Sequence, residues 1–496
     1  MSQNSILGMG LTGWQDAVGS AGGELSMTKS QIGLIGLGTM GSALSLNIAE
    51  KGFPISVYNR TSTTTDSFMA QAGSLAPAIT PTKSLPEFVE SIASPRAVIL
   101  MVPAGEPTDA QIRALQPLLG PDDLIIDAGN ANFHDTNRRA EESITAGVPF
   151  MGIGVSGGEE GARHGPSIMG GGPKDSWARV QPVLEAISAK YKGTPCATWM
   201  GQGGAGHFVK AVHNGIEYAD MQMIAETYGV LRDGMGWSAA QCGQVFAKWN
   251  EGPLQSYLIE ISGKVSAATD AATGSPVLDI ILDRAGQKGT GRWTVIEAQH
   301  LGAPIPVIEA AVTARNISSR LDLRIQGQAT FGAAPQPLAK DSLSVETLEG
   351  AMIAGKIMCY AQGFDLLQAA SDTFDWTLPM SEIAKVWREG CIIRSGMLND
   401  MAEALAGAPG QNLMYSPVFS ALVTQSQAAL RQTVSVAQAN GLPVPALSAA
   451  LSYFDMMRTA RSTANMIQAQ RDFFGAHSFE RTDQDGAHHG PWGGSS

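Results

Sequence analysis

Four polar side chains in one helical segment have the types and the spacing needed for acid–base chemistry. They stand at positions i, i+3, i+4 and i+7, which a helix places on one face: Lys210, His213, Asn214 and Glu217. The residues between them are apolar or small, the reverse of a surface helix with a narrow apolar stripe. Buried ionisable groups are costly unless they are paired or bound. The stripe is therefore either a structural ion network or a site for a polar ligand.

The composition indicates a large globular protein around this stripe. The chain has 496 residues, 44% of them hydrophobic and 16% charged, which is enough for two or three domains. Its net charge of -12 argues against a nucleic-acid partner, which normally needs a basic face. No apolar run is long enough to cross a membrane, and residues 1–30 lack the pattern of a signal peptide. We expect neither nucleic acid nor membrane as a partner.

The cysteines favour a reducing compartment. They lie far apart in the sequence: Cys196, Cys242, Cys359 and Cys391. Neither a Cys-x-x-Cys pair nor a Cys/His cluster occurs, so the sequence predicts no metal site and no redox pair. This usage is typical of the cytoplasm.

Residues 31–205 alternate short β-type runs with helical stretches, the pattern of a doubly wound α/β domain with a parallel sheet. The expected strands cover residues 32–35, 54–58, 97–102 and 124–127. Beyond a glycine-rich hinge, long helical periodicities predict a large all-α domain over residues 206–470. Residues 1–30 are expected to form a flexible extension and residues 471–496 an extended C-terminal tail, with loop or disorder from Arg481 onward.

A Gly-x-Gly-x-x-Gly motif stands between the first predicted strand and a predicted helix at 40–50. It comprises Gly36, Leu37, Gly38, Thr39, Met40 and Gly41. The first glycine of such a motif makes the tight turn, the second lets a pyrophosphate approach the backbone, and the third allows close helix–strand packing. The placement predicts a dinucleotide site at the helix N-terminus in a Rossmann-type domain. A plain structural turn is the minority interpretation.

The end of the second predicted strand indicates which dinucleotide binds. An NAD enzyme usually has Asp or Glu there, whereas this chain has Asn59, Arg60 and Thr61. A carboxylate would repel a 2′-phosphate, but an arginine can pair with it. The signature predicts NADP; the alternative is that Arg60 is an ordinary surface arginine.

Further segments carry groups that suit an anionic ligand. Asn130 follows the strand at 124–127, at the carboxyl edge where open α/β folds bind ligands. Ser156, Gly157 and Gly158 form a turn that exposes a hydroxyl and backbone N–H groups. Taken alone, this loop could equally lack a ligand.

Cationic groups are scattered through the second half of the chain. Lys288 and Thr290 lie in another glycine-rich loop, and Arg315, Arg471 and His477 follow. The loop is not a P-loop, because GxxxxGK[ST] is absent. Taken singly, each of the charged side chains could simply form a salt bridge at the surface.

Together these motifs resemble the 6-phosphogluconate dehydrogenase family, the decarboxylating enzymes of the pentose phosphate pathway. The resemblance covers about residues 31–480 and rests on segments 36–41, 59–61, 127–130, 154–163, 206–210, 213–218, 288–291, 360–364, 390–394 and 471–477. It implies a Rossmann domain, a large helical domain and a homodimer in which each C-terminal tail threads into the partner subunit. It also implies oxidation of 6-phosphogluconate at C3 with NADP, followed by loss of CO2 to give ribulose 5-phosphate and NADPH.

The resemblance assigns roles to named residues. It implies that Lys210 is the catalytic base and Glu217 the acid. It implies a substrate site made by Asn130, Ser156, Gly157, Gly158, His213, Asn214, Tyr218, Lys288, Thr290 and Arg315, with Arg471 and His477 supplied by the other subunit. It implies cofactor contacts from the glycine motif at 36–41 and from Asn59, Arg60, Thr61, Val102, Pro103, Ala104 and Asn130.

Two other interpretations remain open from the sequence, and a third is disfavoured. Another β-hydroxyacid dehydrogenase, such as a 3-hydroxyisobutyrate-type enzyme, would be shorter and would lack the Lys-Gly-Thr-Gly loop and the tail. A catalytically idle NADP-binding regulator would need neither Lys210 nor Glu217. A UDP-sugar dehydrogenase would need a nucleophilic cysteine in its catalytic loop, and no cysteine here lies in a matching motif.

Overall fold

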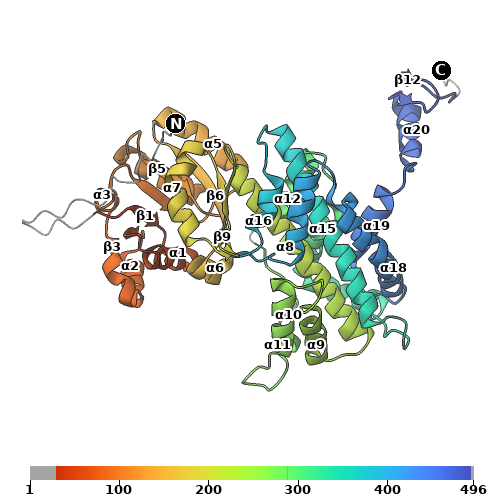
Figure 1. The fold of residues 1–496 in the computed structure, drawn as a ribbon. Helices are drawn as coiled ribbons and strands as arrows, with labels where there is room; N and C mark the ends of the chain where they lie inside the picture. The colour runs from red at the N-terminus through yellow and green to blue at the C-terminus, as the bar shows by residue number, and fades with distance from the viewer. Residues whose placement is uncertain (1–28, 288, 493–496) are drawn as a thin grey trace, which may run out of the picture.

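The computed structural model describes residues 29–287 and 289–492. Figure 1 shows a sheet covered by helices, followed by a larger helical part and a tail. The N-terminal extension predicted over residues 1–30 lies outside the described residues except for its last two, and so does Lys288.

The first part contains an eight-stranded sheet in the order β10-β7-β6-β5-β4-β1-β2-β3. Its strands are β1 (Ile32–Ile35), β2 (Ile55–Tyr58), β3 (Ile79–Thr82), β4 (Ala97–Leu100), β5 (Leu124–Asp127), β6 (Phe150–Ser156), β7 (Ser167–Gly171) and β10 (Ala197–Gly201). Strands β1 to β6 are parallel, β7 runs antiparallel to β6, and β10 runs parallel to β7. The strand order reverses at β1, which lies between β2 and β4, and this switch point is where open α/β sheets bind ligands.

The predicted strand at 97–102 is too long by two residues. Strand β4 ends at Leu100, and Val102 and Pro103 belong to a loop. A proline has no amide hydrogen with which to continue the ladder.

Helices cover both faces of this sheet, as the doubly wound pattern predicts. They are α1 (Thr39–Glu50), α2 (Ser62–Gln71), α3 (Leu85–Glu90), α4 (Glu106–Leu115), α5 (Phe133–Ala146), α6 (Gly158–His164) and α7 (Lys174–Ile187). Alternate residues of β4 enter two separate apolar cores. Ala97 and Ile99 pack with α1, α2 and α7, whereas Val98 and Leu100 pack with α3, α4 and α5.

The second part is helical and is organised around α8 (Ala205–Gly229). Its other helices are α9 (Ala239–Trp249), α10 (Tyr257–Ala267), α11 (Val277–Ile280), α12 (Thr290–His300), α13 (Pro306–Ser318), α14 (Leu321–Phe331), α15 (Val345–Thr373), α16 (Met380–Val386), α17 (Met397–Gly407), α18 (Pro417–Ala439) and α19 (Pro445–Met457). Helix α8 contacts β6 and β7 of the sheet as well as α12, α13 and α15. It therefore links the two parts. Within the described ranges, no helix is long and apolar enough to span a membrane.

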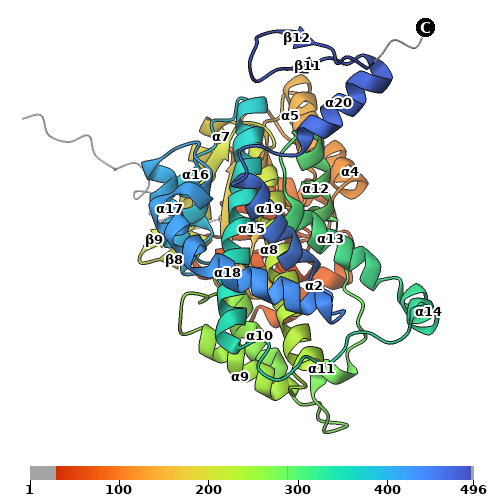
Figure 2. The same cartoon turned by 90° about the vertical axis from the view of Figure 1, so that its right-hand side faces the viewer.

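The C-terminal tail projects from the helical part (Figure 1 and Figure 2). It consists of α20 (Ala464–Gly475) and a small hairpin of β11 (Phe479–Glu480) and β12 (Ala487–His488). The prediction of loop from Arg481 onward is therefore wrong at β12. Asp472 of α20 holds this hairpin in place. Its carboxylate accepts hydrogen bonds from the amides of Ser478 and Gly490 and from the Trp492 indole.

Glu226 of α8 caps the N-terminus of α19. Its carboxylate accepts hydrogen bonds from the amides of Ala446 (2.8 Å) and Leu447 (2.9 Å) and from the Gln222 side chain (3.0 Å). Burial nevertheless raises the pKa of Glu226 from 4.5 to about 7, because desolvation outweighs these bonds.

This raised pKa gives the folded protein a measurable pH dependence. The stabilisation from the bound proton is fully present below pH about 4.5 and is lost as the pH rises through about 7. Between about pH 5 and pH 8, we expect the free energy of unfolding of the wild type to fall by about 2–3 kcal/mol more than that of Glu226→Gln. Urea unfolding at both pH values measures this difference, and an identical pH dependence in the two proteins would contradict it.

Candidate active site

The structure brings Lys210 to the carboxyl end of strand β6. Its Nζ lies 3.1 Å from Ser156 Oγ and 2.7 Å from Asn214 Oδ1, and it donates to both. Lys210 and Asn214 are 7% and 8% exposed, and Ser156 is 2% exposed. The polar face predicted on α8 therefore exists, and its lysine is buried among neutral hydrogen-bond partners.

His213 extends this network behind the lysine. Its Nε2 lies 3.3 Å from Ser156 Oγ, and its Nδ1 lies 3.0 Å from Asn214 Oδ1. The tautomer with its proton on Nδ1 satisfies both contacts, because the serine hydroxyl then donates to Nε2. The ring packs edge-on against Trp387 at a centroid distance of 5.7 Å.

Burial moves the two ionisable groups on α8 toward their neutral forms. Desolvation lowers the pKa of Lys210, although Glu217 opposes the shift. Desolvation also raises the pKa of Glu217, against the charges of Lys210 and Arg315. His213, fully buried, has a pKa well below its usual value, first because of desolvation and then because of Lys210. The site thus holds a potential base and a potential acid on one helical face, two turns apart.

Glycines allow α8 to approach the sheet closely enough to place Lys210. A Cβ on Gly154 of β6 would stand 2.5 Å from Lys210 Cβ, and one on Gly206 of α8 would stand 2.4 Å from the Met169 carbonyl oxygen. Small residues at both surfaces are therefore required by the packing. Gly154 and Gly206 belong to segments 154–163 and 206–210, on which the family resemblance rests.

The Ser-Gly-Gly turn lies directly after β6. Gly157 has φ of 113°, and a Cβ there would be 2.5 Å from the Gly390 carbonyl oxygen, so glycine is required. A Cβ on Gly158 would meet nothing within 4 Å, so its backbone faces open space. Gly158 is exposed next to the buried Ser156, and ligand binding by this turn stays a prediction.

Helix α12 closes the other side of the site. Asn214 Nδ2 donates to Thr290 Oγ1 at 2.8 Å, which ties the first turn of α12 to α8. The Arg315 guanidinium stacks on the Tyr218 ring at 3.5 Å from its centroid, and its Nη1 donates to the Gly286 carbonyl at 3.0 Å. Lys288 lies outside the described residues.

The glycine motif between β1 and α1 has the geometry of a dinucleotide turn. Gly36 has φ of 102°, and a Cβ there would stand 2.4 Å from the Met101 carbonyl oxygen. A Cβ on Gly41 would stand 1.8 Å from the Gly36 carbonyl oxygen, which explains the close packing of α1. A Cβ on Gly38 would meet nothing within 4 Å, and this residue caps α1 without a side-chain hydrogen bond. The helix N-terminus is therefore open to an anion.

The polar residues that follow β2 lie beside this glycine turn. Asn59 Oδ1 accepts a hydrogen bond from the Leu37 amide at 3.0 Å and so fixes the turn, while Arg60 and Thr61 are exposed beside it. A hollow of about 570 Å³ beside the turn is lined by residues of the turn, of α1 and of α2, and by Glu159, Glu160 and Arg163 of α6. Asn130 and Pro103 are exposed, with Val102 and Ala104 half-buried in their loop.

The structure does not bring Arg471 and His477 to this site. Both are exposed on the projecting tail, where Arg471 Nη1 donates to Gln468 Oε1 at 3.1 Å. Among the described contacts, none joins either residue to α8 of its own chain.

Arg139 positions the Asn130 loop, although no sequence motif indicates it. Arg139 of α5 is buried, and its guanidinium donates to Asp127 Oδ2 (3.2 Å) and Asp109 Oδ1 (2.7 Å). Asp127 Oδ1 accepts in turn from the Gly129 amide at 3.0 Å, one residue before Asn130. The network holds the loop that carries Asn130. A buried aspartate at a strand end was the only signal available in the sequence.

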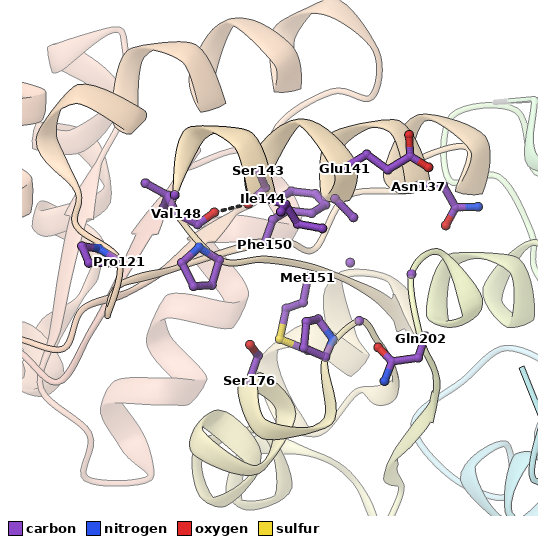
Figure 3. Close-up of a pocket in the computed structure, with 17 residues that line it drawn as sticks. Pro121, Asn137, Glu141, Ser143, Ile144, Val148, Phe150, Met151, Ser176 and Gln202 are labelled. Atoms are coloured by element: carbon purple, nitrogen blue, oxygen red, sulfur yellow. Dashed lines mark hydrogen bonds between the residues drawn. The ribbon is translucent and has the colours of Figure 1, made fainter.

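A second hollow lies away from these groups. It has a volume of about 630 Å³ and follows α5 and the start of α7 (Figure 3). Glu141 is the only ionisable residue among its lining residues, and the rest are apolar or neutral. It offers no acid–base pair.

The fold and the site define a dehydrogenase class: a Rossmann domain that binds a dinucleotide, joined to a helical domain that supplies a buried lysine and a glutamate.

Comparison with known proteins then identifies the family. The family model for the "NAD binding domain of 6-phosphogluconate dehydrogenase" matches residues 31–201, and that for "6-phosphogluconate dehydrogenase, C-terminal domain" matches residues 206–492. The chain belongs to the 6-phosphogluconate dehydrogenase family, which confirms the resemblance carried by the motifs.

Individual relatives cover almost the whole chain. The Bacillus subtilis protein named 6-phosphogluconate dehydrogenase, NADP(+)-dependent, decarboxylating is 48% identical over 94% of this chain and 100% of its own length. A Synechococcus elongatus 6-phosphogluconate dehydrogenase, decarboxylating, is 46% identical with the same coverage. The solved Plasmodium falciparum 6-phosphogluconate dehydrogenase, studied with NADP+ and with 6-phosphogluconate, has a TM-score of 0.90 at 40% identity and covers 93% of this chain and 100% of its own.

Proposed function

We propose that this protein oxidises and decarboxylates 6-phosphogluconate to ribulose 5-phosphate and CO2 while reducing NADP. The observation that carries the proposal is the Lys210–Glu217 pair, whose pKa values are displaced by burial in the directions that a base and an acid require. The pair lies on the helix that joins the dinucleotide domain to the helical domain. Family membership and relatives of matching length support the same reaction.

The residues around the glycine turn fit NADP. The open N-terminus of α1 suits the pyrophosphate, and the exposed Arg60 suits a 2′-phosphate. When bound, the nicotinamide accepts a hydride from the substrate. The exposed Arg60 is the feature that favours NADP over NAD.

Lys210 acts first in the proposed mechanism. In its neutral form, favoured by burial, the amine takes the proton from the C3 hydroxyl of the substrate. The resulting ammonium then stabilises the oxygen of the 3-keto acid, so that CO2 leaves to give an enediol. Ser156 and Asn214, both within hydrogen-bond distance of Nζ, hold the amine in place.

Glu217 completes the cycle. Its raised pKa keeps a proton available, and the carboxylic acid gives that proton to C1 of the enediol while the Lys210 amine takes the proton of the adjacent hydroxyl, so that the keto product forms. Thr290, Tyr218 and Arg315 surround the opposite end of the site, where Arg315 suits the phosphate.

A direct assay tests this proposal. Purified full-length protein is mixed with 6-phosphogluconate and NADP, and NADPH is followed by absorbance, with unphosphorylated gluconate as the control substrate. We expect turnover with 6-phosphogluconate and little with gluconate. Tight NADP binding without turnover would overturn the proposal and favour a non-catalytic regulator.

Arg60 is expected to set cofactor preference. Arg60→Glu removes the partner of the 2′-phosphate and adds a repelling charge, so kcat/KM for NADP is expected to fall by at least about tenfold while that for NAD changes little. Steady-state kinetics with both cofactors measures the ratio. Lys51→Ala, an exposed cation at the far end of α1, is the matched control and should leave the ratio unchanged.

We also propose a homodimer in which each tail completes the partner's site. The tail exposes large apolar side chains that a lone chain leaves in water: Met466, Ile467, Phe473 and Phe474, each at least 59% exposed. Arg471 and His477 belong to this tail, and α20 projects away from α8 of its own chain (Figure 1). Contact with a second copy would cover the apolar groups and deliver Arg471 and His477 to the partner's site.

Complementation between two inactive variants tests the exchange. Lys210→Met and Arg471→Ala are each expected to be inactive, yet dissociated and re-associated mixtures should regain up to about a quarter of wild-type activity. Half of the dimers are then hybrids in which one site has both residues intact. No recovery from demonstrated hybrids of two inactive variants would mean that Arg471 acts within its own chain.

We further infer that the enzyme works in the cytoplasm. All four cysteines are buried and unpaired, which suits a reducing compartment. Fractionation of cells that produce the native protein would test this.

A further inference from the structure

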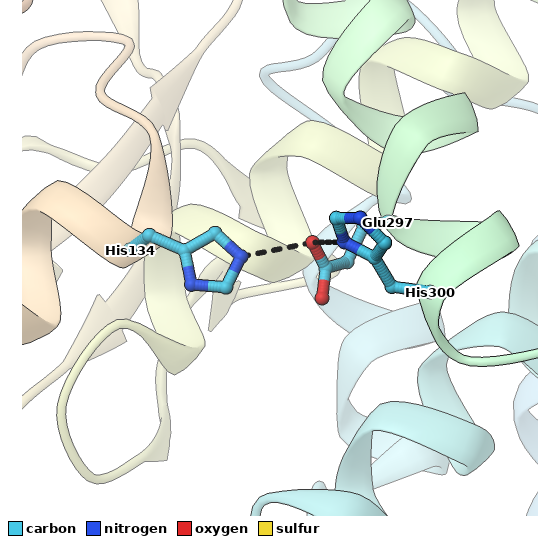
Figure 4. Close-up of side chains that lie close together, drawn as sticks. All are labelled: His134, Glu297 and His300. Carbon is cyan, nitrogen blue, oxygen red and sulfur yellow. Dashed lines mark hydrogen bonds and ion pairs between the residues drawn. The ribbon is translucent and has the colours of Figure 1, made fainter.

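Two histidines and a glutamate meet where α5 of the first part of the chain approaches α12 of the second. His134 Nε2 lies 2.9 Å from Glu297 Oε2, and His300 Nδ1 lies 3.4 Å from the same oxygen (Figure 4). The three potential ligand atoms all lie within 4.8 Å of one another. His134 belongs to α5 of the dinucleotide domain, whereas Glu297 and His300 belong to α12.

The glutamate of this cluster is nearly buried, whereas both histidines are accessible to solvent. The Glu297 side chain is 7% exposed, but those of His134 and His300 are 54% and 65% exposed. A nearly buried carboxylate is therefore held beneath two solvent-accessible imidazoles. Within the described residues, the contacts of this carboxylate are with one nitrogen of each imidazole, so the three side chains direct their possible ligand atoms toward one point.

The donor set and spacing match the preferences of a borderline-soft divalent cation. Zinc binds imidazole nitrogen at about 2.0–2.1 Å and carboxylate oxygen at about 2.0–2.2 Å, so neighbouring ligands of a tetrahedral site stand about 3.3 Å apart. The two contacts of Glu297, at 2.9 and 3.4 Å, bracket that separation. Imidazole and carboxylate together suit Zn²⁺, and the exposed side leaves a fourth position for water.

We propose that His134, Glu297 and His300 form a binding site for a divalent transition-metal ion such as Zn²⁺, which ties α5 to α12. This site is separate from the proposed catalysis, which uses no metal.

The positions of the ligands indicate what a bound ion would hold. His134 is the second residue of α5 and follows the loop of Asn130 by four positions. Glu297 and His300 lie in the last turn of α12, whose first residue, Thr290, accepts the hydrogen bond from Asn214. An ion shared by the two helices therefore fixes the dinucleotide domain against an element that lines the active site.

Calorimetric titration of metal-free, full-length protein with ZnCl₂ tests the site. The wild type is expected to bind one Zn²⁺ per chain saturably. Glu297→Gln and His300→Ala are each expected to lower this affinity by at least about tenfold. The matched control is His164→Ala, which removes an exposed histidine 3.8 Å from Glu160 on α6 and should bind as the wild type does.

Hydrogen exchange supplies a second readout that loss of folding does not imitate. Zn²⁺ is expected to slow amide exchange at the start of α5 and the end of α12 in the wild type and in His164→Ala, but not in Glu297→Gln. Absence of saturable Zn²⁺ binding by the wild type would overturn the proposal. Equal affinity in Glu297→Gln, His300→Ala and the wild type would overturn it as well.

Discussion

Replacing Lys210 by methionine is expected to lower kcat by about 10²–10⁴-fold, the usual contribution of a general acid–base group. Methionine is similar in length and apolar, so it suits the buried position, but it can neither accept the C3 proton nor stabilise the keto oxygen as an ammonium. Ser156 and Asn214 would keep their places because each has another partner, His213 and Thr290. Stopped-flow or steady-state NADPH formation gives kcat, and equilibrium titration gives NADP affinity, which should be unchanged.

Two further variants separate the role of the base from simple charge. Lys210→Arg keeps a cation that cannot lose its proton near neutral pH, so it should be as impaired as Lys210→Met. Lys264→Met removes an exposed lysine that pairs with Glu260 on α10 and should retain full activity. If Lys210→Met kept kcat within about threefold of the wild type, Lys210 would not be the base.

Lys356→Met is expected to have the largest effect on stability. Lys356 of α15 and Asp220 of α8 are fully buried, with Nζ 2.8 Å from Asp220 Oδ2 and 3.2 Å from Ser256 Oγ. Removing the lysine leaves a buried carboxylate without its partner, which typically costs about 3–5 kcal/mol. Chemical unfolding by circular dichroism measures the change in the free energy of unfolding.

The double variant Lys356→Met/Asp220→Leu tests the cause. Because it removes both charges, it should recover most of the stability lost in the single variant. If the single variant were as stable as the wild type, the pair would contribute little. Asp220 lies three residues beyond Glu217, so this ion pair also anchors the helix that carries the proposed acid and base.

Local patterns were enough to predict the doubly wound class of the first part and four of the eight strands of its sheet. The buried strand Ile32–Ile35, the glycine motif and the helix after it are continuous in sequence, and their hydrophobicity and turn chemistry are local properties. The polar face of α8 could also be predicted, because helical spacing alone decides which residues share a face. The extra residues given to the strand after Ala97 show the usual limit of such patterns at element ends.

Contacts between distant segments could not be predicted. His134 and Glu297 are 163 positions apart, so no spacing rule indicates that they meet. The same holds for the buried Lys356–Asp220 pair, which depends on how α15 packs on α8. The order of the tail arises from Asp472, whose hydrogen bonds to Gly490 and Trp492 have no local sequence signature.

The measurement that tests the central claim most directly is the fate of the substrate carboxyl carbon. 6-Phosphogluconate labelled with ¹³C at C1 is incubated with the protein and NADP, and ¹³C NMR follows the label while absorbance follows NADPH. The account predicts one labelled CO2 or bicarbonate for each NADPH, with unlabelled ribulose 5-phosphate as the other product. Formation of NADPH while the label stays in the sugar acid would mean a dehydrogenase that does not decarboxylate, and it would contradict the roles given to Lys210 and Glu217.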